Sequence, residues 1–212
     1  MQEQKTFPNF LIENSFNDLI VAGIDEAGRG PLAGPVVASC VILDSKNYPK
    51  EINDSKKLTA KLRQKIFIEL KEKSYFGIGL VDAKKIDEIN ILQATKLAMK
   101  LAYQDLISKY QIFPQAILVD GNFIPFEASN QIQKILPVIK GDQKSLSIAA
   151  ASIIAKETRD KIMRDLHKEF PQYSWDKNAA YPTKFHIEKI FEFGISKFHR
   201  QTFQPIKDLI KK

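Results

Sequence analysis

Residues 21–35 read VAGIDEAGRGPLAGP, an apolar run that ends in two adjacent carboxylates and passes at once into a Gly-Arg-Gly turn. Residues 20–24 and residues 35–43 (PVVASCVIL) are short, apolar and rich in β-branched side chains, so both are predicted to be buried strands. The tight glycine-rich connection favours a hairpin-like pairing between them. Two acids beside a basic tripeptide do not improve a core, so this stretch indicates either a special turn or a ligand site.

The composition is that of an ordinary globular protein with a basic surface. The chain has 212 residues, of which 44% are hydrophobic and 27% charged. Its formal net charge is +7 and its sequence pI is about 9.3. An excess of Lys and Arg suits a polyanionic partner, because neutralising phosphates releases counterions. Many small proteins are simply basic, however, so charge alone leaves a nucleic-acid role and a bland surface about equally favoured.

The remaining general features point to a soluble protein of a reducing compartment. Cys40 is the only cysteine, lies in an apolar run and is expected to be a buried small hydrophobe, with no disulfide or zinc set. Residues 1–10 lack the order of a signal peptide, and no apolar run approaches the roughly 20 residues of a membrane-spanning helix. We therefore expect a cytoplasmic protein with no membrane contact.

The pattern along the chain predicts a single domain, residues 1–212, of the α/β class. Further strands are expected at 75–81 and 116–120, and a third acid-ending run covers 135–142. Helices are expected at 59–73, with Thr59 as N-cap, at roughly 91–109, at 144–170, at 183–194 and at 204–212. This order predicts a mixed β-sheet flanked by helices, with a core over about 20–170 and a helical C-terminal extension over 171–212.

Three of the predicted strands end in acids, and this is the main chemical signal in the chain. If the strand ends converge on one edge of the sheet, the four carboxylates would repel one another unless a cation lay among them. Ligation by oxygen alone favours Mg²⁺ or Mn²⁺ over zinc. Two such ions could hydrolyse a phosphodiester without a protein nucleophile. The acids in question are Asp25, Glu26, Asp120 and Asp142.

Each of these acids also has a plainer interpretation. Taken singly, Asp120 is better explained as a turn former and Asp142 as a helix N-cap. The adjacent pair Asp25 and Glu26 is harder to explain in that way, because neighbours in an extended chain point to opposite sides and the glycine-rich turn follows directly.

Glycines and basic residues add candidate substrate contacts. Gly28 and Gly30, with Arg29 between them, allow the backbone to approach a ligand closely and could grip a ribose 2′-hydroxyl, although a tight hairpin with an incidental Arg explains them too. Lys56 precedes a predicted helix N-terminus, where phosphate binds well, but such lysines are more often merely solvated. In the helix predicted at 144–170, one face carries a polar stripe that could meet a backbone phosphate, formed by Ser145, Ala149, Ser152 and Lys156.

Taken together, these stretches resemble the ribonuclease HII family, the type 2 ribonucleases H. The resemblance runs from about residue 20 to residue 206. The matching blocks are, in chain order, GIDEAGRGPLAGPVVA (23–38), NDSKKLT (53–59), DEINILQAT (87–95), LVDGN (118–122), IKGDQKSLSIAAASIIAKETRD (139–160), YPT (181–183) and HRQTFQPI (199–206).

The resemblance implies a ribonuclease H-like fold and metal-dependent cleavage of the RNA strand of RNA–DNA hybrids, including cleavage on the 5′ side of single ribonucleotides in duplex DNA. It implies that Asp25, Glu26, Asp120 and Asp142 are catalytic and bind two Mg²⁺ or Mn²⁺ ions. It further implies that residues 28–30 recognise the 2′-hydroxyl at the RNA–DNA junction, that Tyr181 stacks on the following sugar, and that the protein is a monomer.

One departure and two alternatives accompany this reading. Members of the family commonly carry a basic residue and a glycine just before the tyrosine, whereas here the run is Asn178-Ala179-Ala180-Tyr181, which puts the pose of Tyr181 and the stringency at the junction in question. A ribonuclease HIII-like, hybrid-specific nuclease is one alternative, although only about 20 residues precede the first predicted strand, where that family usually has an extra domain. The other is a non-catalytic hybrid-binding module, which would be expected to have a broken set of acids.

Overall fold

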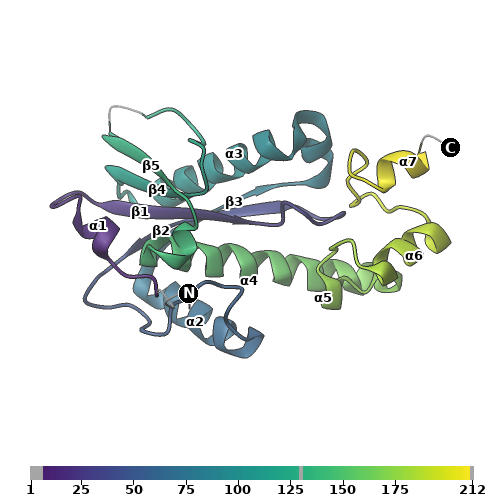
Figure 1. Ribbon diagram of the computed structural model, residues 1–212, viewed down its shortest axis with the longest axis horizontal. Coiled ribbons are helices and arrows are strands. Elements are labelled where there is room, and N and C mark those ends of the chain that lie inside the picture. Colours follow the sequence, from purple (N-terminus) through teal and green to yellow (C-terminus); the bar gives the residue numbers. More distant parts are fainter. Residues whose placement is uncertain (1–6, 129–130, 211–212) are drawn as a thin grey trace, which may run out of the picture.

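A computed structural model describes residues 7–128 and 131–210, and it shows a five-stranded mixed sheet with helices on both faces (Figure 1). The sheet order is β3-β2-β1-β4-β5, in which β3, β2 and β1 are antiparallel neighbours and β4 and β5 run parallel to β1. The strands are β1 (Val21–Ala27), β2 (Val36–Leu43), β3 (Ser74–Val81), β4 (Ala116–Asp120) and β5 (Lys134–Val138). The predicted fold class is confirmed.

The five predicted helices occur in the predicted order, with some differences at their ends, and the structure adds two short helices and two 3₁₀ turns that were not predicted. The α-helices are α1 (Leu11–Asn14), α2 (Ala60–Lys73), α3 (Ala83–Tyr110), α4 (Leu146–Glu169), α5 (Trp175–Asn178), α6 (Lys184–Phe193) and α7 (Ile206–Ile210), and the 3₁₀ turns are η1 (Gly141–Gln143) and η2 (Pro171–Tyr173). Thr59 caps α2, as predicted, because its hydroxyl accepts a hydrogen bond from the backbone N–H of Leu62.

Two elements differ from expectation. The helix expected from about residue 91 begins at Ala83, capped by Asp82, and is interrupted at Asn90, whose φ of 65° is not helical and whose side chain caps the second segment through the backbone N–H groups of Leu92 and Gln93. The run 135–142 is not one strand ending in Asp142. The strand β5 ends at Val138, and Asp142 lies in η1, because Lys140 takes a left-handed conformation and turns the chain.

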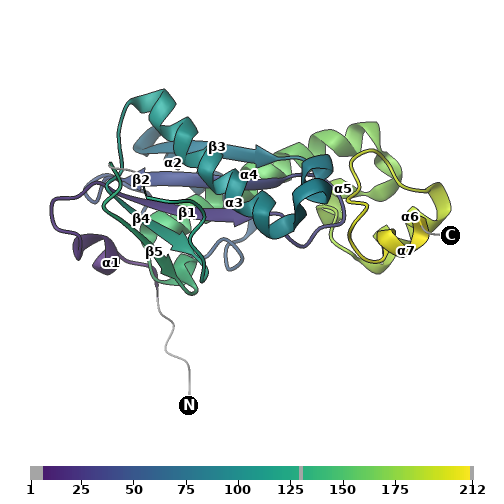
Figure 2. The same ribbon diagram turned by 90° about the horizontal axis from the view of Figure 1, so that it is seen from above.

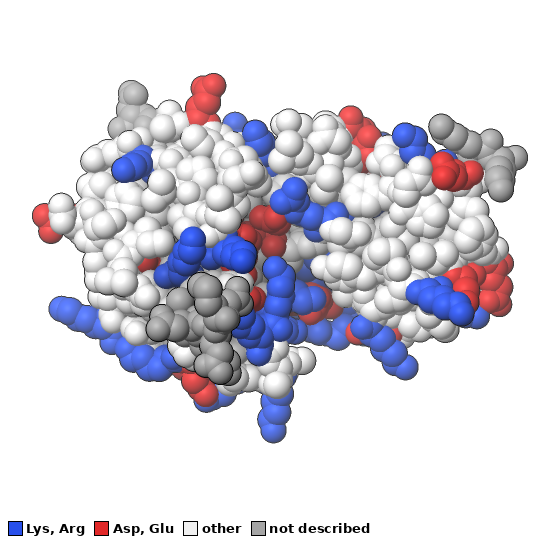
Figure 3. All heavy atoms as spheres, viewed as in Figure 1, with Lys and Arg blue, Asp and Glu red and all other residues white. Residues whose placement is uncertain are grey.

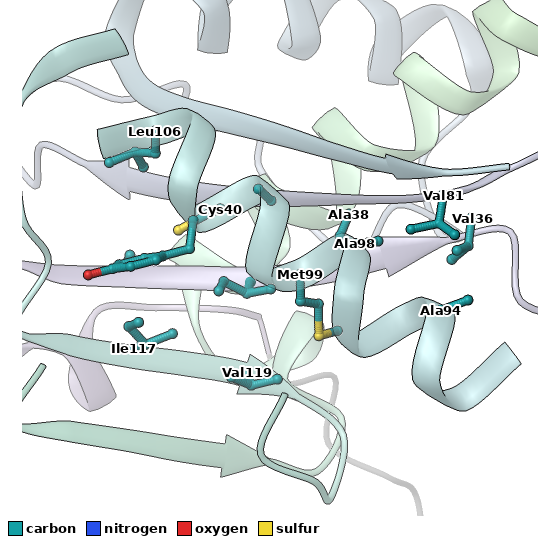
Figure 4. Close-up of a cluster of buried hydrophobic side chains, with 14 of the residues drawn as sticks. Val36, Ala38, Cys40, Val81, Ala94, Ala98, Met99, Leu106, Ile117 and Val119 are labelled. Atoms are coloured by element: carbon teal, nitrogen blue, oxygen red, sulfur yellow. The ribbon is translucent and has the colours of Figure 1, made fainter. Parts of the chain in front are cut away.

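Both faces of the sheet are covered closely. On one face α3 packs over the sheet, as Figure 4 shows for Ala98, which lies beside Ala38 of β2, and the buried cluster on this face also includes Met99 and Val119. On the other face α4 lies so near β1 that a Cβ atom built on Gly23 would be 2.2 Å from the backbone carbon of Ser147. The buried run Ala149-Ala150-Ala151 permits this approach, as the sequence indicated.

The C-terminal part packs beyond the end of the sheet. In Figures 1 and 2, α5, α6 and α7 lie together at the end of the molecule opposite α1. Their core is aromatic, with Tyr173 and Trp175 stacked at 5.1 Å, and it includes Met163 from the end of α4. Leu32 and Ala33, from the loop after β1, belong to the same core. The C-terminal part is therefore joined directly to the loop that contains the Gly-Arg-Gly turn.

Candidate active site

A cleft lies where the C-terminal ends of β1 and β4 meet α4 and the loop before α6. It collects nine of the ten predicted site residues, which come from five separate stretches of the chain. In Figure 3, a hollow in the middle of the visible face contains acidic atoms and has Lys and Arg atoms around it. The lining residues are Asp25, Glu26, Ala27, Gly28, Arg29, Gly30, Ser55, Lys56, Asp120, Ser152, Lys156, Arg159 and Tyr181.

Asp25 and Glu26 lie within β1, two residues and one residue before its last residue, and both are largely buried. Burial raises the pKa of Asp25 well above its ordinary value, and the neighbouring charges of Glu26 and Asp120 raise it further. Burial also raises the pKa of Glu26, although the guanidinium of Arg29, 3.2 Å from Oε1, opposes this effect. The second carboxylate oxygen of Glu26 is buried and has no hydrogen-bond partner among the described residues.

Asp120 is the last residue of β4, as predicted, and the parallel pairing of β4 with β1 brings it toward Asp25. Its Oδ1 atom accepts a hydrogen bond of 2.6 Å from the backbone N–H of Gly141, which ties it to the turn that contains Asp142. Asp142 is buried beside this group but does not line the cleft itself. Burial, together with the charges of Asp54 and Asp120, raises the pKa of Asp142 to about 6.

The lysines lie close to these acids. Burial alone would lower the pKa of Lys56, but the carboxylates of Asp142, Asp25, Asp54 and Asp120 raise it above its ordinary value. Lys56 is therefore a positively charged side chain that interacts with the acid cluster. Lys156 also lines the cleft, but its Nζ atom lies 2.7 Å from Asp160 on the next turn of α4, so part of its charge is already compensated.

The polar stripe on α4 is only partly available to a substrate. Ser152 faces the cleft and shares a hydrogen bond of 2.9 Å with Ser55. Ser145 is the N-cap of α4 and is fully buried, where its hydroxyl donates to Glu13 at 2.6 Å. The expectation that Ser145 shares a phosphate-binding face with Lys156 is therefore wrong, because Ser145 is used to close the helix end.

The Gly-Arg-Gly turn and Tyr181 face each other across the cleft. Gly28 has a φ of +100°, a conformation that other residues adopt at a cost, and a Cβ atom on Gly30 would lie 3.6 Å from Cε1 of Tyr181. Tyr181 is 46% exposed and its ring is free to contact a ligand. The structure thus places the two predicted sugar-recognition elements side by side, although they are about 150 residues apart in the chain.

The run before Tyr181 folds without the glycine that was expected there. Ala179 and Ala180 both have positive φ values, 46° and 62°. Asn178 holds this conformation, because its Oδ1 accepts from the backbone N–H of Ala180 at 2.8 Å and its Nδ2 donates to the carbonyl of Tyr173 at 2.8 Å. The backbone N–H of Leu32 also donates to the carbonyl of Ala180, which ties this run to the loop after β1.

Several residues of the site escaped the sequence analysis. Asp54 lies beside Asp142 and, although within the NDSKKLT block, gave no separate signal. Arg159 lines the cleft, and its spacing of three residues from Lys156 on the same helix could have indicated it. Arg200 and His186 contact the backbone of the substrate-facing loops from the buried side, and only the tertiary structure shows this.

The acid cluster is better suited to binding a divalent metal ion than to remaining ionised without one. Within residues 7–128 and 131–210, no group of three or more His, Cys, Asp and Glu side chains is arranged so that it could already hold a metal ion. One oxygen of Asp25, Glu26 and Asp120 is engaged by a protein donor in each case. The buried, unpartnered oxygen of Glu26 and the raised pKa values of Asp25 and Asp142, which arise first from burial and then from neighbouring carboxylates, nonetheless indicate acids with too little positive charge nearby, a deficit that a hard cation would relieve.

Comparisons with known proteins point in one direction. A family model described as Ribonuclease HII matches residues 22–206. The ribonuclease HII of Desulfotalea psychrophila is 49% identical over 207 residues, covering 95% of this chain and 89% of that protein. The crystal structure of ribonuclease H2 from Pyrococcus horikoshii superposes with a TM-score of 0.72 at 27% identity, covering 90% of this chain and 97% of that one. Bst-RNase HIII in complex with Mn²⁺ shares the fold, with a TM-score of 0.73 at 19% identity over 95% of this chain and 72% of that one.

Proposed function

The chain belongs to the ribonuclease HII family and is a ribonuclease H hydrolase, and from this premise we propose that it is a divalent-metal-dependent endonuclease that also cuts on the 5′ side of single ribonucleotides embedded in duplex DNA. Membership sets aside the non-catalytic binding module. The observation that carries the proposal is the cleft itself, where Asp25, Glu26 and Asp120 lie beside the Gly-Arg-Gly turn and Tyr181. The acids that would support hydrolysis and the residues that would contact the ribose therefore line the same cleft.

The carboxylates would hold the metal. Asp25, Glu26 and Asp120 line the cleft, and Asp142 lies next to Asp120 through the Gly141 hydrogen bond. Two Mg²⁺ or Mn²⁺ ions, when bound, supply an activated water and stabilise the leaving 3′-oxygen. Burial and the charges of neighbouring carboxylates raise the pKa values of Asp25 and Asp142, so a larger fraction of these two carboxyls is protonated in the metal-free protein. Binding of a cation would favour their ionised forms. We therefore expect proton release when metal binds.

The rest of the cleft orients the nucleic acid. Lys56 and Lys156 lie at the rim of the acid cluster and would contact backbone phosphates next to the one that is cut. Residues 28–30 would contact the ribose hydroxyl, which distinguishes RNA from DNA. The exposed ring of Tyr181, next to Gly30, would stack on the following deoxyribose. Cleavage would then fall between a deoxynucleotide and the ribonucleotide that follows it, leaving a 3′-hydroxyl and a 5′-phosphate.

A cleavage assay tests this proposal directly. Labelled duplex DNA with one embedded ribonucleotide and a continuous RNA–DNA hybrid are incubated with Mg²⁺, with Mn²⁺ and with EDTA. We expect metal-dependent cutting of both, with the lone ribonucleotide cut on its 5′ side. Cutting of the hybrid alone would contradict the junction activity and favour behaviour like that of ribonuclease HIII. Cutting in EDTA would contradict the metal dependence.

The acid assignment is tested by Asp120→Asn, with Asp165→Asn as the matched control. Asp165 lies on the exposed side of α4, where it pairs with Lys161 and Lys168, so its loss leaves the cleft intact. We expect Asp120→Asn to lower the cleavage rate by at least about 10³-fold while substrate binding persists, and Asp165→Asn to cut normally. A normal rate for Asp120→Asn would show that Asp120 does not hold the metal.

A further inference from the structure

Two arginines contact the loop after β1 from within the fold, almost completely buried and without a counterion among the described residues, and Arg159 also borders the cleft. Arg159 and Arg200 are 1% and 0% exposed. In the part of the chain that the structure describes, neither guanidinium has a carboxylate within 4 Å. Burial of a charge without a partner is costly, and it lowers the pKa of Arg200 to about 9 and that of Arg159 to about 10. Because this burial is energetically unfavourable, we expect the two guanidiniums to have a role in holding the surrounding backbone.

Within the described part of the chain, both guanidiniums donate hydrogen bonds only to backbone carbonyls. Arg200 donates to the carbonyls of Gly28 at 2.7 Å, Arg29 at 3.0 Å and Gly34 at 2.9 and 3.0 Å. Arg159 donates to the carbonyls of Ala33, Pro35 and Ala179, each at 3.0 Å. The two side chains therefore hold the loop after β1 from its buried side, and Arg159 links that loop to the run before Tyr181.

The hydrogen bonds from Arg200 to the loop carbonyls fix the direction in which the backbone N–H groups of the loop point. In a planar trans peptide, the C=O and the following N–H point in opposite directions. Because the carbonyls of Gly28 and Arg29 point inward to Arg200, the N–H groups of Arg29 and Gly30 point away from it, and both of these residues line the cleft. Among the described residues, neither N–H has an acceptor. Arg29 and Gly30 are exposed, so water meets these donors in the free protein, and both are open to an acceptor oxygen of a ligand bound in the cleft.

We propose that Arg200 is a positioning residue that aims the backbone N–H groups of Arg29 and Gly30 at the ribose 2′-oxygen, so that the loop reads this hydroxyl chiefly as a hydrogen-bond acceptor. The inference rests on the proposed function, since it concerns how the ribonucleotide is distinguished. Arg200 itself does not touch the substrate. Its planar fork spans three carbonyls at once, a geometry that the single ammonium of Lys cannot reproduce.

A phosphate oxygen is the other acceptor that such a donor pair could meet, and the two sources predict different behaviour. If the donors meet a 2′-oxygen, loss of their alignment weakens binding of a duplex with a ribonucleotide and leaves binding of the all-DNA duplex nearly unchanged. If they meet a phosphate, both duplexes weaken equally, because every nucleotide has one. The ratio of the two dissociation constants therefore separates the sources.

The experiment compares Arg200→Lys with Arg164→Lys, an exposed arginine on α4 that receives the same substitution. Dissociation constants are measured by fluorescence anisotropy, with Ca²⁺ in place of Mg²⁺, for a duplex with one ribonucleotide and for the same duplex in DNA only. Thermal unfolding of each variant is recorded alongside. We expect Arg200→Lys to lower the discrimination ratio about tenfold, the equivalent of about 1.4 kcal/mol, and Arg164→Lys to leave it unchanged.

A folded Arg200→Lys variant with an unchanged ratio, or with equal weakening of both duplexes, overturns the inference. If that variant does not fold, the Arg29–Gly30 amide is converted to an ester by placing glycolic acid at position 30, which removes one N–H and leaves Arg200 in place. The ester should lower the ratio as well, and an unchanged ratio would overturn the inference. A wild-type protein that cuts the hybrid but shows a ratio near one would instead contradict the proposed junction activity itself, and the inference with it.

Discussion

At the scale of single residues, the acid cluster shows how function opposes stability. Asp142 is 5% exposed and lies beside Asp54 and Asp120, so its ionised form is disfavoured in the fold. Its pKa is about 6 in the folded chain against an ordinary value of 3.8. A carboxyl with a raised pKa in the fold stabilises the protein below its unfolded pKa, and this contribution is lost as the pH rises through the folded value. The metal-free site is therefore strained at neutral pH.

Asp142→Asn should relieve this strain while damaging catalysis. In EDTA at pH 7.5 we expect the variant to be more stable than the wild type by about 1–2 kcal/mol, and the difference to vanish near pH 4, where Asp142 is protonated. Urea unfolding at several pH values measures this. Addition of Mg²⁺ should stabilise the wild type more than the variant. An Asn variant that is less stable than the wild type at pH 7.5 in EDTA would contradict the assignment.

Lys56 gives a second prediction at this scale. Because it is exposed at the rim of the cleft, its removal should cost one phosphate contact. Lys56→Gln should weaken binding to the all-DNA duplex and to the ribonucleotide duplex alike, and reduce the slope of log K against log salt by about one. The control is Lys161→Gln on the exposed side of α4. An unchanged salt slope for Lys56→Gln would show that this lysine serves only to balance the acids.

At the scale of elements, the run between α5 and α6 depends on side-chain and backbone ties rather than on glycine. Ala179, the C-cap of α5, adopts φ 46° and ψ 32°, a left-handed conformation that costs an alanine roughly 1 kcal/mol. The carbonyl of the same residue accepts from Arg159, and Asn178 bonds the next N–H. The departure from the family pattern is therefore compensated locally, and Tyr181 still reaches the cleft.

Ala179→Gly should stabilise this run, against the usual direction of such a change. We expect a gain of about 0.5–1 kcal/mol in the free energy of unfolding, because glycine adopts positive φ freely and Ala179 is only half-buried. The control is Ala155→Gly, inside α4 and fully buried, which should destabilise by more than 1 kcal/mol. Equal losses in both variants, measured by urea unfolding, would argue against strain at position 179.

At the scale of the whole molecule, buried polar groups join the C-terminal part to the cleft. Trp175 Nε1 donates to Nε2 of His186 at 3.0 Å, so the proton of the His186 ring lies on Nδ1, which donates to the carbonyl of Tyr181 at 3.0 Å. His199 accepts from the backbone N–H of Ser196 through Nδ1, so its Nε2 faces Nε2 of His186 as a donor at 3.3 Å. Each donor meets an acceptor only while both rings are neutral.

This network makes the fold sensitive to acid. Burial, and then the neighbouring His186, lower the pKa of His199 to about 3, below the 6.5 of an unfolded chain. A base whose pKa is depressed in the fold stabilises the protein above its unfolded pKa, and this stability is lost as the pH falls below about 6.5. Between pH 7 and pH 5, the free energy of unfolding of the wild type should therefore fall by about 2 kcal/mol more than that of His199→Gln, because only the wild type takes up a proton on His199 when it unfolds. Urea unfolding of both proteins at both pH values measures this difference. An equal loss of unfolding free energy in the two proteins would contradict the prediction.

None of the helices within the described residues is long and apolar enough to cross a membrane. The sheet, its flanking helices and the positions of Asp25, Glu26 and Asp120 were predictable from the sequence, because they depend on local patterns. Apolar runs with β-branched residues form strands, caps such as Thr59 begin helices, and acids at the ends of adjacent strands converge.

Only the tertiary structure decided the rest, because it depends on contacts between segments far apart in the chain. Asp142 lies on a turn rather than at a strand end because the left-handed Lys140 redirects the backbone there. Ser145 closes a helix against Glu13 instead of facing a phosphate. The grip of Arg200 on residues 28 and 29 spans more than 170 positions, and no local pattern signals it. Local propensity determined the elements and the acids, whereas the long-range hydrogen bonds of buried side chains decided how the substrate-facing backbone is aimed.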